Sequence, residues 1–267
     1  MKIRYYSDLV NDDFAGTNIN QIPIDDNFKY ENKNIFFKLG SFILYRIIAR
    51  PILYLFIKIH WWNSFKNKKV LKQCKNKGYF IYGNHTLTAS DAYIPNIMHA
   101  KKRNYIIFNP DATSIIGIRS IVMMMGDIPL PNTAKSAIKF KDMVKSVIDH
   151  KNTITIYPEA HIWPFYTDIR PFNELFLTYQ VELNAPGYAF VNVSVKRKLK
   201  FIKRPKIRTY IVGPFYPDEE LSFRERKIKL RDEIYSEMKK IVDKTPTYKY
   251  KYDYVYKEKS EQLRKKP

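Results

Sequence analysis

The stretch YFIYGNHTLTASD, residues 79–91, determines the fold that the sequence predicts. Its first four residues are a short apolar run, which suits a buried strand, and the loop that follows carries His85 and Asp91. Histidine titrates near neutrality, and a carboxylate on its far ring nitrogen fixes the tautomer and stabilises the imidazolium. The pair therefore predicts proton abstraction from an alcohol, with His85 as the base and Asp91 as its orienter.

The spacing of this pair sets a condition on the loop. On a regular helix, residues six positions apart would point about 120° away from each other. His85 and Asp91 can meet only if the residues between them form a turn before any helix begins. Thr86, Thr88 and Ser90 are good turn and cap residues for that purpose.

Strand and helix patterns alternate along the rest of the chain. A length of 267 residues with 45% apolar content is enough for one sizeable core. We expect a single α/β domain over residues 70–244, with a mixed sheet flanked by helices. The expected strands are 79–82, 105–108, 154–157, 186–195 and 207–213, and the expected helices are 92–100, the apolar stretch 115–125 after a turn at 109–113, 133–150 and 222–244 with Ser222 as N-cap.

The first loop has a counterpart in a known family. A strand, Gly-Asn-His, a few small residues and an aspartate resemble the first motif of the glycerolipid acyltransferases, typified by 1-acylglycerol-3-phosphate acyltransferase. That family usually has four residues between histidine and aspartate. The five found here resemble a variant of some Gram-positive bacterial members. The resemblance implies that His85 and Asp91 are catalytic and that Asn84 contributes to substrate binding.

Two later blocks fall in the family's order. GDIPLP at 126–131 lies where the second motif ends in a phosphate-binding arginine, but here Pro131 stands near that place. Lys135 and Lys139 could supply the missing cations, or they could form a solvated basic face. YPEA at 157–160 resembles the third motif, which implies that Glu159 holds the acceptor or organises nearby cations. Arg170 is the nearest compensating cation, and a structural cap is the alternative role for Glu159.

The most hydrophobic stretch is residues 35–62, which cations interrupt at Lys38, Arg46, Arg50 and Lys58. Its uncharged runs are too short for a plain transmembrane helix, which needs about 20 apolar residues. The cations leave a wide apolar face, and Pro51 can open a second helix. We expect an amphipathic helix pair that lies in one leaflet, although two helices that cap the core would fit the same pattern.

Both termini differ in composition from the domain. Residues 1–34 are polar, lack the plan of a secretory signal, and predict a solvated loop or a docking strand. The basic tail 245–267 alternates tyrosine with lysine or another residue, which suits a membrane headgroup interface, stacking on single-stranded nucleic acid, or a disordered solubilising tail.

The net charge of +21 indicates an anionic partner, and nucleic acid and an anionic membrane surface both satisfy it. The single cysteine fits a reducing cytoplasmic setting. No nucleophile elbow, Gly-rich dinucleotide loop or zinc-type histidine spacing is present, so we expect no serine hydrolase, no cofactor and no metal site.

These observations predict an acyltransferase at the cytoplasmic face of the cell membrane, monotopic or peripheral. The resemblance implies transfer of an acyl group from acyl-CoA or acyl-ACP to 1-acylglycerol 3-phosphate, giving phosphatidic acid. Its predicted partners are membrane lipids, a lysophospholipid acceptor and acyl carrier protein. The alternatives are another lysophospholipid or hydroxylated lipid as acceptor, or a basic nucleic-acid-binding protein.

Overall fold

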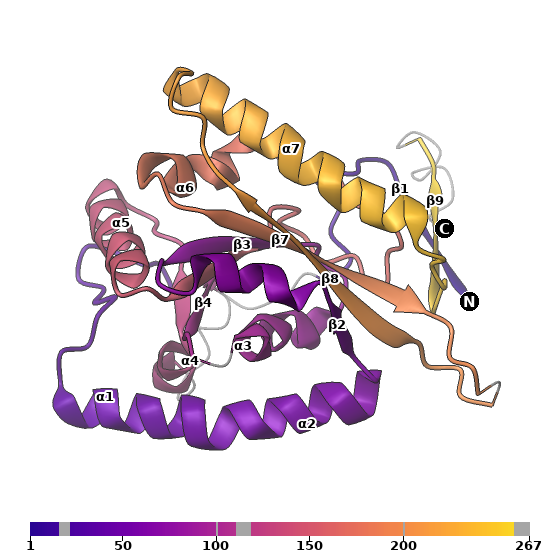
Figure 1. Ribbon diagram of the computed structural model, residues 1–267, viewed down its shortest axis with the longest axis horizontal. Helices are drawn as coiled ribbons and strands as arrows, with labels where there is room; N and C mark the ends of the chain where they lie inside the picture. Colours follow the sequence, from indigo (N-terminus) through magenta and orange to yellow (C-terminus); the bar gives the residue numbers. More distant parts are fainter. Residues whose placement is uncertain (16–21, 100, 111–118, 200, 259–267) are drawn as a thin grey trace.

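A mixed β-sheet forms the centre of the molecule (Figure 1). The computed structural model describes residues 1–15, 22–99, 101–110, 119–199 and 201–258. Within these ranges seven strands form the sheet in the order β2-β8-β7-β3-β6-β4-β5, and every neighbouring pair is parallel except the antiparallel pair β7 and β8. The strands are β2 (Ser64–Lys66), β3 (Tyr79–Gly83), β4 (Asn104–Phe108), β5 (Asp127–Pro129), β6 (Thr153–Ile156), β7 (Gly187–Val195) and β8 (Lys206–Phe215).

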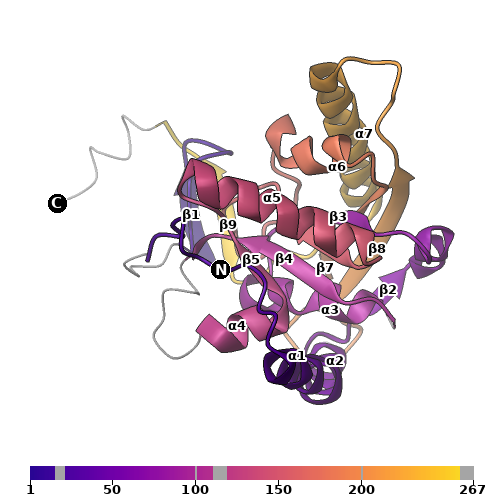
Figure 2. The same ribbon diagram turned by 90° about the vertical axis from the view of Figure 1, so that its left-hand side faces the viewer.

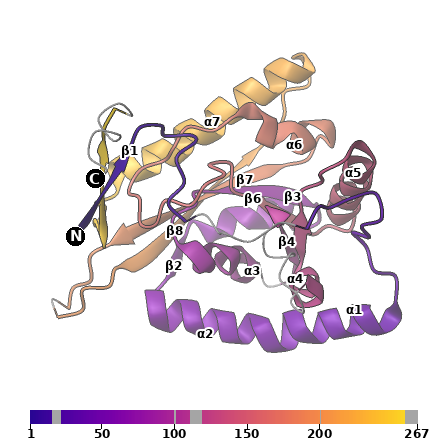
Figure 3. The same ribbon diagram turned by 180° about the vertical axis from the view of Figure 1, so that it is seen from behind.

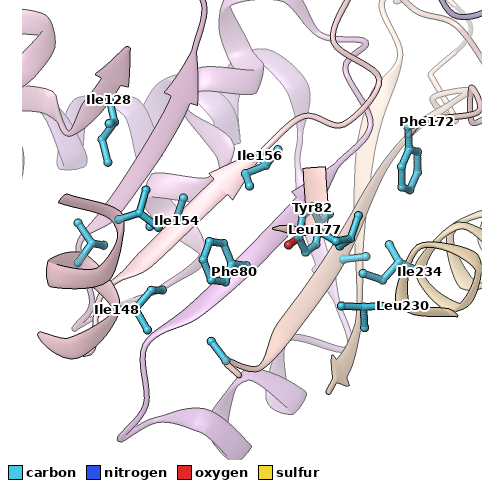
Figure 4. Close-up of a cluster of buried hydrophobic side chains, with 14 of the residues drawn as sticks. Phe80, Tyr82, Ile128, Ile148, Ile154, Ile156, Phe172, Leu177, Leu230 and Ile234 are labelled. Atoms are coloured by element: carbon cyan, nitrogen blue, oxygen red, sulfur yellow. The ribbon is translucent and has the colours of Figure 1, made fainter. Parts of the chain in front are cut away.

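Helices cover both faces of this sheet (Figures 1 and 3). One face carries α5 (Ala134–Asp149), α6 (Thr178–Glu182) and α7 (Phe223–Lys244), which is capped by Ser222, and the other carries α2 (Arg50–Trp61) and α3 (Ile94–Met98). Side chains alternate across β3: Phe80 and Tyr82 enter the core beneath α5 and α7 (Figure 4), whereas Tyr79 and Ile81 enter the core beneath α2. The predicted mixed sheet flanked by helices is confirmed.

The expected helices and strands recur with small shifts at their ends, but strands β2 and β5 were not expected. The helix predicted at 92–100 is reduced to α3, because the 3-10 turn η3 (Thr88–Ala92) precedes it. The start of the apolar stretch 115–125 and part of the turn at 109–113 lie outside the described residues, and α4 (Arg119–Met125) is the described part. Short 3-10 segments, η2 (Lys68–Cys74) and η5 (Glu174–Leu177), link other elements.

The helix pair expected at residues 35–62 is instead one continuous helical rod. Its segments α1 (Ile35–Phe42), the π-helical η1 (Ile43–Ala49) and α2 follow without a break, and every junction residue is right-handed helical. Figure 2 shows α1 and α2 nearly end-on, one behind the other. Pro51 does not break the rod, because the π-helical register just before it changes the hydrogen-bond pattern where the proline lacks an N–H.

Much of this rod is apolar and exposed. Its exposed large apolar side chains are Ile35, Phe36, Leu39, Phe42, Ile43, Ile47, Ile48, Ile52, Tyr54, Leu55, Phe56 and Ile59, and Trp62 follows directly. Only a few side chains, such as Tyr45, Ile57 and Trp61, are buried against the domain. None of the helices in the described ranges is long and apolar enough to cross a membrane.

The two terminal segments pair with each other. β1 (Lys2–Tyr6) lies parallel to β9 (Tyr252–Tyr256), so the N-terminal segment contains the docking strand that was one of its two predicted alternatives. The alternative of a disordered tail is wrong for residues 252–256, which form β9. The tyrosine alternation of the tail is the two-residue period of a strand. Residues 16–21 of the N-terminal segment and the charged end of the tail, 259–267, lie outside the described residues.

Candidate active site

The site forms where neighbouring parallel strands end. Tyr82 of β3 pairs with Ile156 of β6, so the loops after both strands meet at one edge of the sheet. The first loop carries His85 and the second carries Glu159. Carboxyl ends of parallel strands are where α/β folds place their ligands and reacting groups.

The turn that the His85–Asp91 spacing requires is present. η3 folds the chain back, and His85 Nδ1 lies 2.9 Å from Asp91 Oδ2, which also accepts the backbone N–H of Leu87 at 2.8 Å. Asp91 is fully buried, whereas the His85 side chain is 17% exposed. Because an ionised carboxylate only accepts, Nδ1 carries the proton and Nε2 holds the free lone pair of a base.

Aromatic residues of α2 and of the segment after β6 fix this loop. The His85 ring stacks on Tyr157 with centroids 4.4 Å apart, and the Tyr157 hydroxyl donates to the backbone oxygen of Asp91. From α2, Trp61 Nε1 donates to Ser90 Oγ at 2.8 Å. The backbone N–H of Trp163 donates to the oxygen of His85 at 3.1 Å. The imidazole therefore has one orientation, set by its neighbours.

Glu159 and Arg170 lie beneath the loop rather than in an open binding site. Their relative exposures are 2% and 0%. Glu159 Oε2 accepts the backbone N–H of His85 at 3.1 Å, Oε1 accepts that of Arg170 at 3.1 Å, and Arg170 Nη2 lies 3.5 Å from Oε2. Burial raises the pKa of Glu159 and Arg170 opposes that shift, while burial lowers the pKa of Arg170 and Glu159 opposes it. These contacts hold the backbone of His85, and the contact with Arg170 agrees with the alternative in which Glu159 organises a nearby cation.

Lys135 and Lys139 do not join the other predicted site residues. Both are exposed on α5, where Lys135 Nζ lies 3.7 Å from Asp26 Oδ2 and Lys139 donates to the backbone oxygen of Asp26. No described contact links either lysine to the loop of His85. The apolar face of α5 packs on the sheet and turns its lysines outward, so the solvated-face alternative describes their contacts.

Asn84 and a residue that the sequence analysis missed, Asn192, lock β3 to β7. Asn84 Nδ2 donates to the Asn192 backbone oxygen at 3.1 Å, and the Asn192 N–H donates to Asn84 Oδ1 at 2.8 Å. Asn192 Nδ2 also reaches Asp91 Oδ1 at 3.4 Å. Thr209 donates to Asn192 Oδ1 at 2.7 Å and accepts from Asn63 at 2.8 Å. An asparagine within the apolar run PGYAFVNVSV was the available signal.

A cavity lies elsewhere in the described part of the chain. It measures about 880 Å³ and is lined by the segment before α1 together with parts of α4 and α5, including Phe28, Arg119, Lys139 and Met143. The described lining contains no residue of the His85 loop. Among the described residues, no group of three or more His, Cys, Asp or Glu is placed to hold a metal ion.

The sheet and the loop together define a class: a mixed α/β fold with a histidine–aspartate pair at the carboxyl ends of its parallel strands. A solved structure with a similar fold is the 1-acyl-sn-glycerophosphate (LPA) acyltransferase, PlsC, from Thermotoga maritima. The match has a TM-score of 0.56 at 13% identity and covers 79% of this chain and 89% of that chain. No protein-family model and no curated protein matches the sequence. The similarity shows a shared fold.

Proposed function

We propose that the protein is an O-acyltransferase that moves a fatty acyl group from a thioester to the hydroxyl of a glycerolipid. The observation that carries this proposal is the His85–Asp91 pair, with Nε2 as its free base, at the end of β3 in a fold shared with an LPA acyltransferase. Buried Asp91 stabilises the imidazolium that forms when His85 takes a proton.

The reaction needs one base and no covalent enzyme intermediate. His85 Nε2 removes the hydroxyl proton as the acceptor oxygen attacks the thioester carbonyl. The C–S bond then breaks, and the imidazolium returns its proton to the leaving sulfur. General base action contributes about 10²- to 10⁴-fold, and orientation of the two substrates supplies much of the remaining rate.

The proposed acceptor is 1-acylglycerol 3-phosphate, with phosphatidic acid as product and acyl-CoA or acyl-ACP as donor. Another lysophospholipid or hydroxylated lipid is the alternative acceptor. This alternative gains weight because Lys135 and Lys139 are exposed on α5 and Arg170 is buried against Glu159. Nucleic-acid binding through the tail loses support, because Tyr254 stacks on Trp163 and is not free to stack on bases.

The proposed location is the cytoplasmic membrane face, with the helical rod 35–62 lying in one leaflet. Its exposed apolar side chains support this placement, since an apolar face of that size in water marks an interaction surface. The protein would then meet its lipid acceptor without extracting it from the bilayer.

The test is transfer from a labelled acyl thioester to a panel of lyso-lipids in detergent. We expect His85→Ala to lower kcat by about 10²- to 10⁴-fold. His161→Ala is the matched control, because that histidine lies on the neighbouring loop, is 38% exposed and contacts only Asp13 as an ion-pair partner among the described residues. Near wild-type transfer by His85→Ala would sink the proposal. Transfer to a different lyso-lipid would keep the mechanism and change the acceptor.

A further inference from the structure

The turn between β7 and β8 has an unusual charge. Residues 196–206, KRKLKFIKRPK, are here called the hairpin tip, and seven of these eleven residues are lysine or arginine. The sequence contains no aspartate or glutamate from residue 183 to residue 217. The tip therefore has no acidic residue nearby in sequence to neutralise it.

The described side chains of the tip are largely directed to solvent. Lys196, Lys198, Lys203 and Arg204 are exposed, and no ion pair to an acidic residue is found for these four within the described ranges. Two apolar side chains stand among the cations: Phe201 is 80% exposed and Leu199 is 42% exposed. This mixture is typical of a surface that contacts both charged headgroups and acyl chains.

The tip is fastened to the end of the helical rod. Arg197 Nη2 donates to the backbone oxygen of His60 at 2.8 Å, and its guanidinium lies 4.8 Å from the ring of Trp62. Arg204 Nη1 lies 3.0 Å from His60 Nδ1. Figures 1 and 3 show the hairpin reaching beyond the sheet next to the carboxyl end of α2. The basic tip therefore contacts the end of the exposed apolar face at Trp62.

Positive charge is concentrated where the two elements meet. Burial lowers the pKa of His60, and the cations of Arg204, Arg197 and Lys251 lower it further. An anion at this junction would relieve the repulsion among these groups.

We propose that the hairpin tip is a second membrane contact, which binds the phosphate headgroups of anionic lipids while the apolar face of the rod lies among the acyl chains. The inference goes beyond the proposed reaction, because it assigns lipid-class selectivity to β7 and β8, and it rests on the membrane attachment proposed above. Basic residues close to an anionic leaflet add up in their attraction. A bilayer covers both the cations and the adjoining apolar side chains, whereas a nucleic acid would leave Phe201 and the rod exposed.

The test compares binding to phosphatidylcholine vesicles with and without phosphatidylglycerol. We expect wild type to prefer the anionic vesicles and the triple variant Lys196→Gln, Lys198→Gln, Lys203→Gln to bind them about 10- to 100-fold more weakly. Binding to pure phosphatidylcholine should not change. The matched control is Arg224→Gln, Lys240→Gln, Lys244→Gln, the same charge change on α7, across the sheet from the rod. Phe201→Ser should also weaken binding without changing any charge.

The outcomes separate this proposal from the proposed function. If the triple variant binds anionic vesicles as tightly as wild type, the hairpin has no such role, while membrane attachment stands. If wild type binds no vesicles, both the proposed membrane attachment and the proposed role of the hairpin tip are wrong. The acyl-transfer assay in detergent would still test the proposed reaction. Preference for an oligonucleotide over anionic vesicles at matched salt would also overturn it. All three variants should keep wild-type activity in detergent.

Discussion

At the scale of single residues, Asp91 is held through both of its oxygens. Oδ2 faces His85 and the N–H of Leu87, whereas Oδ1 faces only Asn192 among the described side chains. We expect Asn192→Ala to lower kcat about 10- to 100-fold, the cost of one hydrogen bond to a charged group, with little change in KM. Ser194→Ala, two residues further along β7, is the control. A change in KM alone would contradict this positioning role.

A second residue-scale prediction concerns pH. His99 is buried and lies 2.7 Å from the Tyr79 hydroxyl, and burial, with nearby cations, lowers its pKa to about 3. Because this folded pKa is below the unfolded value, the stabilisation is present above about pH 6.5 and is lost as pH falls. Between about pH 7.5 and about pH 5, wild type should lose about 2 kcal/mol more free energy of unfolding than His99→Gln. Parallel urea-denaturation profiles would refute it.

The sequence predicted contacts between residues of one loop better than it predicted which side chains are buried. His85 and Asp91 share one loop, so their meeting depended only on a turn between them. Even there, the left-handed backbone of Thr88, with φ of 51°, had no local signal, because β-branched residues rarely adopt it. The burial of Glu159 with Arg170 depends on how the segment that carries both residues packs against the distant loop of His85. Residue type and spacing carry no information on that packing, so the sequence left open whether Glu159 holds the acceptor, organises a cation or acts as a structural cap.

At the scale of elements, the ring of Phe190 on β7 occupies the space beside Gly83 of β3, where a larger residue would have its side chain. A Cβ there would lie 2.3 Å from Cζ of Phe190. We expect Gly83→Ala to reduce the free energy of unfolding by about 1–3 kcal/mol, measured in urea. Adding Phe190→Leu should recover part of that loss, because the ring is the obstacle. Simple additivity of the two substitutions would argue against the contact as the cause.

The sequence predicted helices and strands correctly where the spacing of apolar residues had one clear period. Strands β3, β4, β6, β7 and β8 and the long helices α5 and α7 were predicted because their patterns are regular and both helices begin with a cap. The three-residue strands β2 and β5 were missed because they are too short to show a period. The prediction of two separate helices was wrong because proline normally breaks a helix, whereas here the π-helical segment before Pro51 lets the helix continue. The strand in the tail was not predicted, because alternating tyrosines form a strand only beside a partner. That partner, β1, is about 250 residues away in the sequence.

At the scale of the whole molecule, the terminal strands support the site from outside. Tyr254 stacks on the buried Trp163 with centroids 5.1 Å apart, and its hydroxyl donates to the backbone oxygen of Pro164 at 2.9 Å. Trp163 in turn bonds to the backbone of His85. Tyr254→Leu should lower the free energy of unfolding by about 1–3 kcal/mol and also lower kcat. Tyr256→Leu, at a 60% exposed position of the same strand, should change neither. Equal effects of the two substitutions would contradict a specific support.

The parallel pairing of β1 with β9 also has a consequence for synthesis. Lys2 pairs with Tyr252, so β1 is made before its partner strand and must wait for residues about 250 positions later in the chain. Until then β1 has no partner strand, and its unpaired backbone groups, together with the exposed Ile3 and Tyr5, can associate with other chains. Slow translation would therefore favour aggregation through β1, and β1 can become ordered only after β9 has been made.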